Sequence, residues 1–232
     1  NKFNIIKIFL NTNIYKYLPG GIWHFVSRYN ILRRKFSNQK SVESVLLEPL
    51  LMLVAGLIFI PFGGFNISVF ILCWSSTLVF INRFRVFIIK KLTRMKAAIF
   101  NSNHKVDDKN LELTLENIST QISYPYKPLF VEMIFILFRF LGFSCCINAF
   151  SIGSLVSQGE LLSSFSLAWI IGLVVPAAPG GLGVFESVIL FALSSQLPEA
   201  ALLSSLLCYR LVSTVSDILA AMVYPVKKLI KV

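Results

Sequence analysis

Charged residues are scarce in this chain of 232 residues: they form 14% of it, whereas they form about a quarter of a typical soluble domain. Histidine is rarer still, since His24 and His104 are the only two. Two histidines so far apart in the sequence offer no spacing typical of a zinc site or of a Ser–His–Asp triad. We therefore predict no catalytic residues, no metal ion and no cofactor.

Cysteine is also infrequent, and its four positions include no Cys-x-x-Cys pair. All four lie within apolar runs, without a neighbouring histidine. This pattern excludes a disulfide framework and a metal cluster, and it predicts buried small side chains. The sequence likewise has no P-loop motif, so nothing in it indicates a nucleotide-driven motor. The four positions are Cys73, Cys145, Cys146 and Cys208.

Hydrophobic residues take the place of the missing charge: they form 56% of the chain, and 21 residues are Phe. This composition predicts an all-α, polytopic membrane helix bundle that forms a single integral membrane domain over residues 1–232. The 22 Lys and Arg exceed the 11 Asp and Glu, which gives a formal net charge of +11. Because basic residues alternate with apolar segments, we expect contact with the membrane and no binding of nucleic acid.

Four apolar windows have the length of about 20 residues that a spanning helix needs. They cover residues 44–62, 65–81, 129–150 and 201–224. Gly63 and Gly64 join the first two windows as a tight hairpin, and both flanks of this hairpin are rich in Lys and Arg. Basic loops stay on the cytoplasmic side, so we expect both hairpin ends to be cytoplasmic. The same rule places the lysine-rich C-terminus in the cytoplasm.

A polar connection over residues 82–128 separates the second and third windows and is predicted to be a cytoplasmic loop, too small for a catalytic domain. Its first part, residues 83–100, alternates basic and apolar positions at helical spacing. That pattern fits a helix that lies in the membrane interface, and it fits equally a solvated helix packed on its neighbours. Both interpretations stay open.

Residues 165–197 are apolar but are interrupted by PAAPGGLG at 176–183. Proline ends a helix and glycine permits a sharp turn, so we predict that the helix is broken here. The polar stretch around Gln158 is typical of an external loop, and the last window must run from outside to inside. A re-entrant pair of half-helices therefore fits the charge rule better than a single crossing. The predicted turn comprises Pro179, Gly180, Gly181 and Gly183.

A second interruption lies within residues 3–27, where YLPGG at 17–21 breaks an apolar stretch. Pro19, Gly20 and Gly21 match the Pro-Gly-Gly of the later turn, and a charged residue follows each copy. An internal duplication, with two broken helices that meet at the membrane midplane, would produce this pattern. We therefore expect a second broken or re-entrant helix and an inverted repeat.

Isolated charges inside apolar windows mark candidate functional positions. Glu132 and Arg139 are seven residues apart, as are Arg210 and Asp217, so each pair lies on one face of its helix. For the first pair we favour mutual neutralisation between packed helices. For Arg210 we favour a function, because a guanidinium can hold a phosphate with two hydrogen bonds. Glu186 would begin the second half-helix, where it either stabilises the helix end or receives a ligand.

Three segments together resemble a known family: YLPGGIWHFVSR at 17–28, PAAPGGLGVFE at 176–186 and LLCYRLVS at 206–213. They are similar to motifs of the lysylphosphatidylglycerol synthase transmembrane family, a flippase-like group of integral membrane proteins. Full-length members have more spans than this chain shows. The chain also begins with Asn1 and not with Met, so we expect that the first spans are missing.

The resemblance maps the functional residues of the family onto Arg28, Glu186 and Arg210, together with the two Pro-Gly-Gly turns. Trp23 and His24 depart from the pattern, because many relatives have a small residue and an acid there. The soluble aminoacyl-transferase domain of the synthases has no counterpart in this sequence. The resemblance therefore implies membrane transport and no synthase activity, and we do not expect an enzyme.

These observations lead us to predict a multi-pass flippase of the bacterial inner (plasma) membrane that moves a phospholipid or a lipid-linked headgroup. Arg28 and Arg210 would hold the phosphate and Glu186 the variable part of the headgroup, with Asp217 completing a polar stripe on the last helix. The alternative is a membrane enzyme, or an accessory subunit, that handles polyisoprenyl-linked sugars. A comparison of sugar transfer with lipid translocation would separate the two. The sequence does not indicate an oligomeric state.

Overall fold

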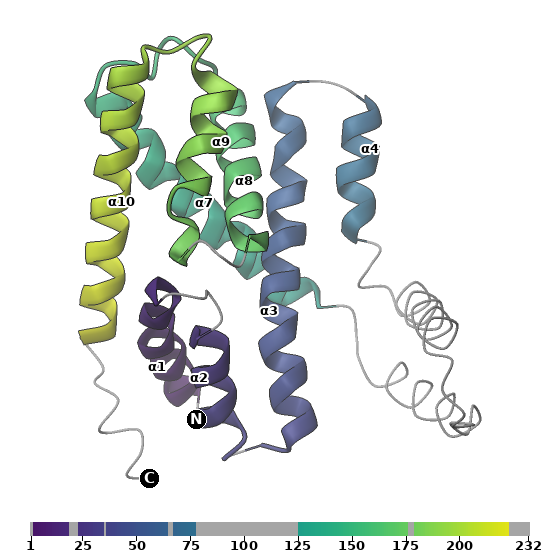
Figure 1. Ribbon diagram of the computed structural model, residues 1–232. Helices are drawn as coiled ribbons and strands as arrows, with labels where there is room; N and C mark the ends of the chain where they lie inside the picture. The colour runs from purple at the N-terminus through teal and green to yellow at the C-terminus, as the bar shows by residue number, and fades with distance from the viewer. Residues whose placement is uncertain are drawn as a thin grey trace, which may run out of the picture.

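The computed structural model describes residues 2–18, 23–34, 36–64, 67–77, 125–175 and 179–222, and every structural statement below concerns these residues. All regular elements within them are helices, as the composition predicts (Figure 1). The first Pro-Gly-Gly turn at 19–21, the predicted interfacial segment 83–100 and the lysine-rich C-terminus lie outside these ranges.

Three helices of the described chain are long and apolar enough to cross a membrane. They are α3 (Asn38–Phe59) with its extension η2 (Ile60–Gly63), α7 (Tyr126–Ala149) and α10 (Glu199–Met222). Helices α7 and α10 have 24 residues each, and a helix rises about 1.5 Å per residue, so each exceeds the roughly 30 Å of a hydrocarbon core. These findings are consistent with location in a membrane.

Helix α4 (Ile67–Ser75) begins the second apolar window, and the described residues continue only to Thr77. Its side chains are largely exposed, and among the described elements it packs against α3 and η2 (Figure 1). The full length predicted for this window, residues 65–81, therefore extends beyond the described residues.

The C-terminal apolar segment is broken where its glycines and prolines predict. Helix α8 (Gln158–Val174) ends before the turn, the short helix η4 (Pro179–Gly181) lies within it, and α9 (Val184–Leu193) follows it. Helices α8 and α9 pack against each other (Figure 1). They have 17 and 10 residues, and each is shorter than the roughly 20 residues that span a bilayer.

The N-terminal segment has a similar outline. Helix α1 (Lys2–Asn13) passes into the short helix η1 (Ile14–Tyr17), and the next described helix is α2 (Trp23–Leu32). Helices α1 and α2 contact each other, and η1 contacts η4, so the ends of the two interrupted segments meet (Figure 1).

Four aromatic rings join the C-terminal helices. Phe143 of α7, Phe165 of α8, Phe185 of α9 and Tyr209 of α10 contact one another, with ring centroids between 5.4 and 6.2 Å apart. All four side chains are at most 4% exposed. Because aromatic pairs add to the free energy gained from burial, this cluster fixes α9 and the turn before it against α10.

The cysteines only partly follow the prediction of buried side chains. Cys73 and Cys146 are buried, but Cys208 is half-buried and Cys145 is exposed, and all four are free thiols. An apolar run does not determine burial, because a helix in a small bundle turns one face to its neighbours and another outwards.

Candidate functional site

A cavity of about 140 Å³ lies where the two interrupted segments meet. About 10–15 Å³ of such space holds one water molecule, so the cavity has room for about ten. Its walls come from α1, η1, α2, α3, α7, α8, η4, α9 and α10. The charged side chains that line it are Lys16, Glu48, Arg139 and Arg210. Aromatic rings also line it, and the guanidinium groups of Arg139 and Arg210 lie over the rings of Trp169 and Phe185.

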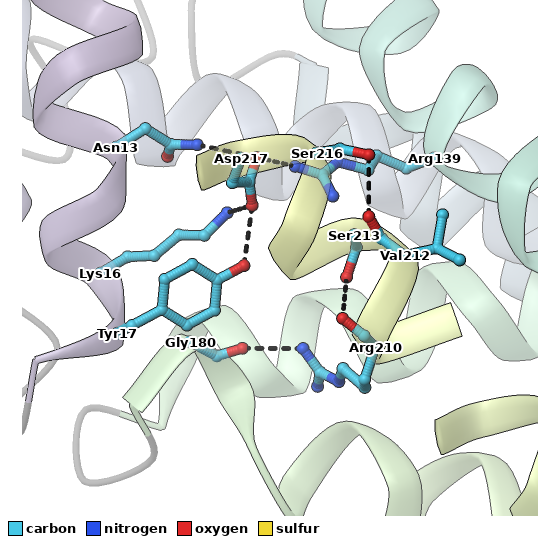
Figure 2. A network of polar contacts seen from close by, with 10 residues as sticks. All are labelled: Asn13, Lys16, Tyr17, Arg139, Gly180, Arg210, Val212, Ser213, Ser216 and Asp217. Atoms are coloured by element: carbon cyan, nitrogen blue, oxygen red, sulfur yellow. Dashed lines mark hydrogen bonds and ion pairs between the residues drawn. The ribbon is translucent and has the colours of Figure 1, made fainter. Parts of the chain in front are cut away.

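Arg210 of α10 holds the Pro-Gly-Gly turn. Its Nη1 donates to the carbonyl oxygen of Gly180 at 3.0 Å, which Figure 2 shows, and its Nη2 donates to that of Gly181 at 2.9 Å. These carbonyls belong to non-helical backbone, where helical hydrogen bonds are missing. In an apolar environment such groups need partners, and the guanidinium of Arg210 provides them.

The glycines of this turn are required by its backbone. Gly180 and Gly181 have φ angles of 59° and 72°, in the left-handed region that residues with a side chain seldom adopt. A Cβ atom on Gly181 would also lie 3.5 Å from the Cα of Gly172 on α8. The turn therefore combines a positive φ with a close approach between two chain segments.

Glu186 lies in the first turn of α9, as predicted, and makes two contacts. Its Oε2 accepts a hydrogen bond from the backbone N–H of Gly183 at 2.8 Å, which caps the helix. Its Oε1 is 2.5 Å from Nε of Arg210. Glu186 is thus the counter-ion of Arg210 and a stabiliser of the helix end.

Asp217 lies two turns further along α10 and accepts bonds from three other elements (Figure 2). Its Oδ2 is 2.7 Å from Nζ of Lys16 and accepts from the Tyr17 hydroxyl at 2.8 Å. Its Oδ1 is 2.8 Å from Nη2 of Arg139 and accepts from Nδ2 of Asn13 at 3.3 Å. One buried carboxylate therefore connects the N-terminal segment, α7 and α10.

One expectation about charge pairing is wrong: Arg139 pairs with Asp217 and not with Glu132. Arg210, for which the sequence favours a function, pairs with Glu186. Residues seven apart lie on the same face of a helix, but they are about 10.5 Å apart along its axis, which is beyond contact distance. Arg139 and Arg210 are therefore each paired across helices.

Arg28 of α2 is buried and is not among the described residues that line the cavity. It forms an ion pair with Glu48 of α3, donates from Nε to the Thr12 hydroxyl at 3.2 Å, and lies over the ring of Phe9. Glu48 itself lines the cavity. Arg28 thus sets the position of an acid in the cavity wall.

The structure separates the predicted site residues into two groups. Among the described residues that line the cavity, Arg210 is the single one of the four predicted. Glu186 and Asp217 are counter-ions of cations that line the cavity, and Arg28 is the counter-ion of the lining acid Glu48. The glycine turn at 180–181 forms part of the wall.

Lys16 and Arg139 are site residues that the sequence did not assign. Arg139 is recognisable in the sequence as a charge inside an apolar window, but its spacing favours an ion pair with Glu132. Lys16 precedes the first Pro-Gly-Gly and carried no signal of its own. Among the described residues, no group of three His, Cys, Asp or Glu is arranged to hold a metal ion.

Comparison of the chain with protein-family models, with curated proteins and with solved structures found no match. The resemblance to the synthase transmembrane family therefore stays a hypothesis based on three short motifs. The candidate site depends on the geometry described above.

Proposed function

We propose that this protein is a flippase-type membrane transporter that receives a phospholipid or lipid-linked headgroup in the cavity between its two broken segments. The observation that carries the proposal is the set of cations in the cavity wall: Lys16, Arg139 and Arg210. Charged side chains in membrane proteins are costly, and they occur mainly where they serve a substrate or ion pathway.

The position of the cavity supports the proposal. Transporters commonly build substrate sites from interrupted helices, because free helix ends and turn backbone provide polar groups at membrane depth. Here η1 and η4 contact each other, and Gly180, Gly181 and Lys16 line the cavity beside them. The proposal includes a polytopic bundle with an inverted repeat and a cytoplasmic C-terminus in a bacterial inner membrane.

The same proposal makes α8 and α9 a re-entrant pair, and labelling tests this part. Cysteines placed at Ser157 and Glu199, in a background without the native cysteines, should both react with an impermeant reagent from the external side. These positions precede α8 and follow α9. Labelling from opposite sides would contradict the re-entrant arrangement.

Translocation is tested with the purified chain in phospholipid vesicles that contain a headgroup-labelled phosphatidylglycerol and an impermeant quencher outside. We expect the protein to expose label from the inner leaflet, and Arg139→Gln to slow this at least about tenfold, because a charged partner of the headgroup is lost. Glu160→Gln is the matched control, since Glu160 bonds Gln196 away from the cavity lining.

Absence of protein-dependent exposure of the label would contradict a flippase. A parallel assay with a polyisoprenyl-linked sugar tests the enzymatic alternative. Sugar transfer without lipid translocation would favour that alternative.

A further inference from the structure

The two cations that hold Asp217 suggest a more specific site, and this inference rests on the proposed function. We infer that Lys16 and Arg139 form a binding site for an anionic phosphate group, and that Asp217 is the internal carboxylate that this group displaces. In the bound state, two oxygens of one phosphate would take the positions that the two oxygens of Asp217 now hold.

Each of the two cations contacts Asp217 and also lines the cavity. Lys16 Nζ and Arg139 Nη2 lie 2.7 and 2.8 Å from different oxygens of Asp217, and both side chains line the cavity. Their side chains are 21% and 17% exposed, whereas that of Asp217 is 8% exposed. A ligand that enters the cavity therefore reaches the cations before it reaches the carboxylate.

Arg139 is held in a fixed orientation. Its guanidinium lies 5.4 Å from the ring centroid of Phe135 and 5.9 Å from that of Trp169. Both aromatic residues line the cavity. A guanidinium whose plane is fixed in this way loses little freedom when it binds two oxygens of one phosphate.

The charges around the cavity leave room for one anion. Lys16, Arg139 and Arg210 are three cations, and the carboxylates that contact them are the two of Asp217 and Glu186. One positive charge of this group is therefore uncompensated within the described contacts. A phosphodiester carries a single negative charge and would balance it, which makes its burial less costly.

The other acid of the cavity wall does not change this balance. Glu48 lines the cavity but is paired with Arg28, so the two form a neutral pair. The control is Glu160, which accepts a hydrogen bond from Gln196 away from the cavity lining: its change to Gln alters the net charge by the same amount as a change of Asp217 to Asn, but it leaves Lys16 and Arg139 paired.

Displacement of Asp217 also has a structural consequence. Asn13, Lys16 and Tyr17 connect the N-terminal segment to α10 through this carboxylate (Figure 2). A phosphate that takes over Lys16 and Arg139 weakens these contacts. Ligand binding is thereby coupled to the attachment of the N-terminal segment, because the ligand favours the arrangement in which Asp217 is released.

The test measures binding to the full chain in detergent micelles, with three probes: dioleoylphosphatidylglycerol, dioleoylglycerol and inorganic phosphate. We expect Asp217→Asn to bind phosphatidylglycerol about tenfold more tightly than the unchanged protein, since the competing charged hydrogen bonds are gone. Glu160→Gln should not gain affinity. A gain with inorganic phosphate as well shows that the phosphate alone is recognised, and a gain with phosphatidylglycerol alone assigns the site to a lipid.

Three results would overturn the inference. They are an unchanged affinity in Asp217→Asn, an equal gain in Glu160→Gln, or an equal gain for dioleoylglycerol, which has the same acyl chains without phosphate. If Asp217→Asn does not fold, Lys16→Gln and Arg139→Gln in the otherwise unchanged protein serve instead. Each should weaken phosphatidylglycerol binding about tenfold. Unchanged binding in both contradicts the site.

The outcome can be separated from that of the proposed function. Phosphatidylglycerol binding that depends on Lys16 and Arg139, without translocation in vesicles, supports the site and contradicts the flippase. Translocation by a protein in which these two residues do not affect binding supports the flippase and contradicts the site.

Discussion

Arg210 and Asp217 lie seven residues apart on α10, and each is the centre of a polar cluster. The two clusters differ in how far apart in the sequence their members lie. Arg210 contacts Gly180, Gly181 and Glu186, all within 30 positions of it along the chain. Asp217 contacts residues as far as 204 positions away. The first cluster shapes a local turn, whereas the second joins the N-terminal segment to the C-terminal helices. Two residues of opposite charge on the same helix therefore have different roles: Arg210 a local one and Asp217 a connecting one.

The largest effect is expected in the local cluster. Arg210→Ala removes three hydrogen bonds and leaves Glu186 and two turn carbonyls without their partner. We expect a loss of about 3–5 kcal/mol in stability, because three hydrogen bonds from a charged group are lost and a half-buried carboxylate loses its counter-ion. Arg210→Lys should lose less. Thermal unfolding and membrane yield measure both, and a fully stable Arg210→Ala would show that the turn does not need this residue.

The next effect concerns the turn itself. Gly181→Leu places a side chain at a positive φ and against Gly172, so we expect a destabilisation of about 3 kcal/mol. Gly183→Ala is the matched control, since Gly183 also has a positive φ but has open space around it. It should cost about 1 kcal/mol. Equal losses in the two variants would mean that close packing at Gly181 contributes nothing.

A double-mutant cycle compares the pairings directly. Lys16 and Asp217 are in contact, so we expect a coupling of about 0.5–3 kcal/mol between Lys16→Gln and Asp217→Asn. Arg210 and Asp217 share no contact, and the cycle between Arg210→Gln and Asp217→Asn should give less than about 0.5 kcal/mol. Unfolding in urea measures both cycles. Strong coupling in the second would contradict the separation of the Arg210 and Asp217 contacts.

The smallest effect is expected when one hydrogen bond of the cluster around Asp217 is removed. Tyr17→Phe removes only the hydroxyl that donates to Asp217 at 2.8 Å. We expect a loss of about 0.5–1.5 kcal/mol. Tyr29→Phe, on α2, is the control for the general effect of removing a hydroxyl. Equal results for the two tyrosines would mean that the bond to Asp217 adds no stability.

The fold was largely predictable where local chemistry decides it. The apolar windows at 129–150 and 201–224 correspond to α7 and α10, and the break in 165–197 lies at the predicted glycines. The site was less predictable. No sequence feature near Lys16 indicates a cavity, and the spacing of Arg139 favours a pair with Glu132. In the structure both cations pair with Asp217.

The sequence by itself determined where helices form and where they stop, because hydrophobic runs, prolines and glycines act on their own segment of backbone. It also determined that Glu186 stands at a helix start. Only the tertiary structure decided which charges meet, since a helix holds residues such as Arg210 and Asp217 about 10.5 Å apart along its axis. Their partners must come from other helices, and packing between helices depends on the whole chain.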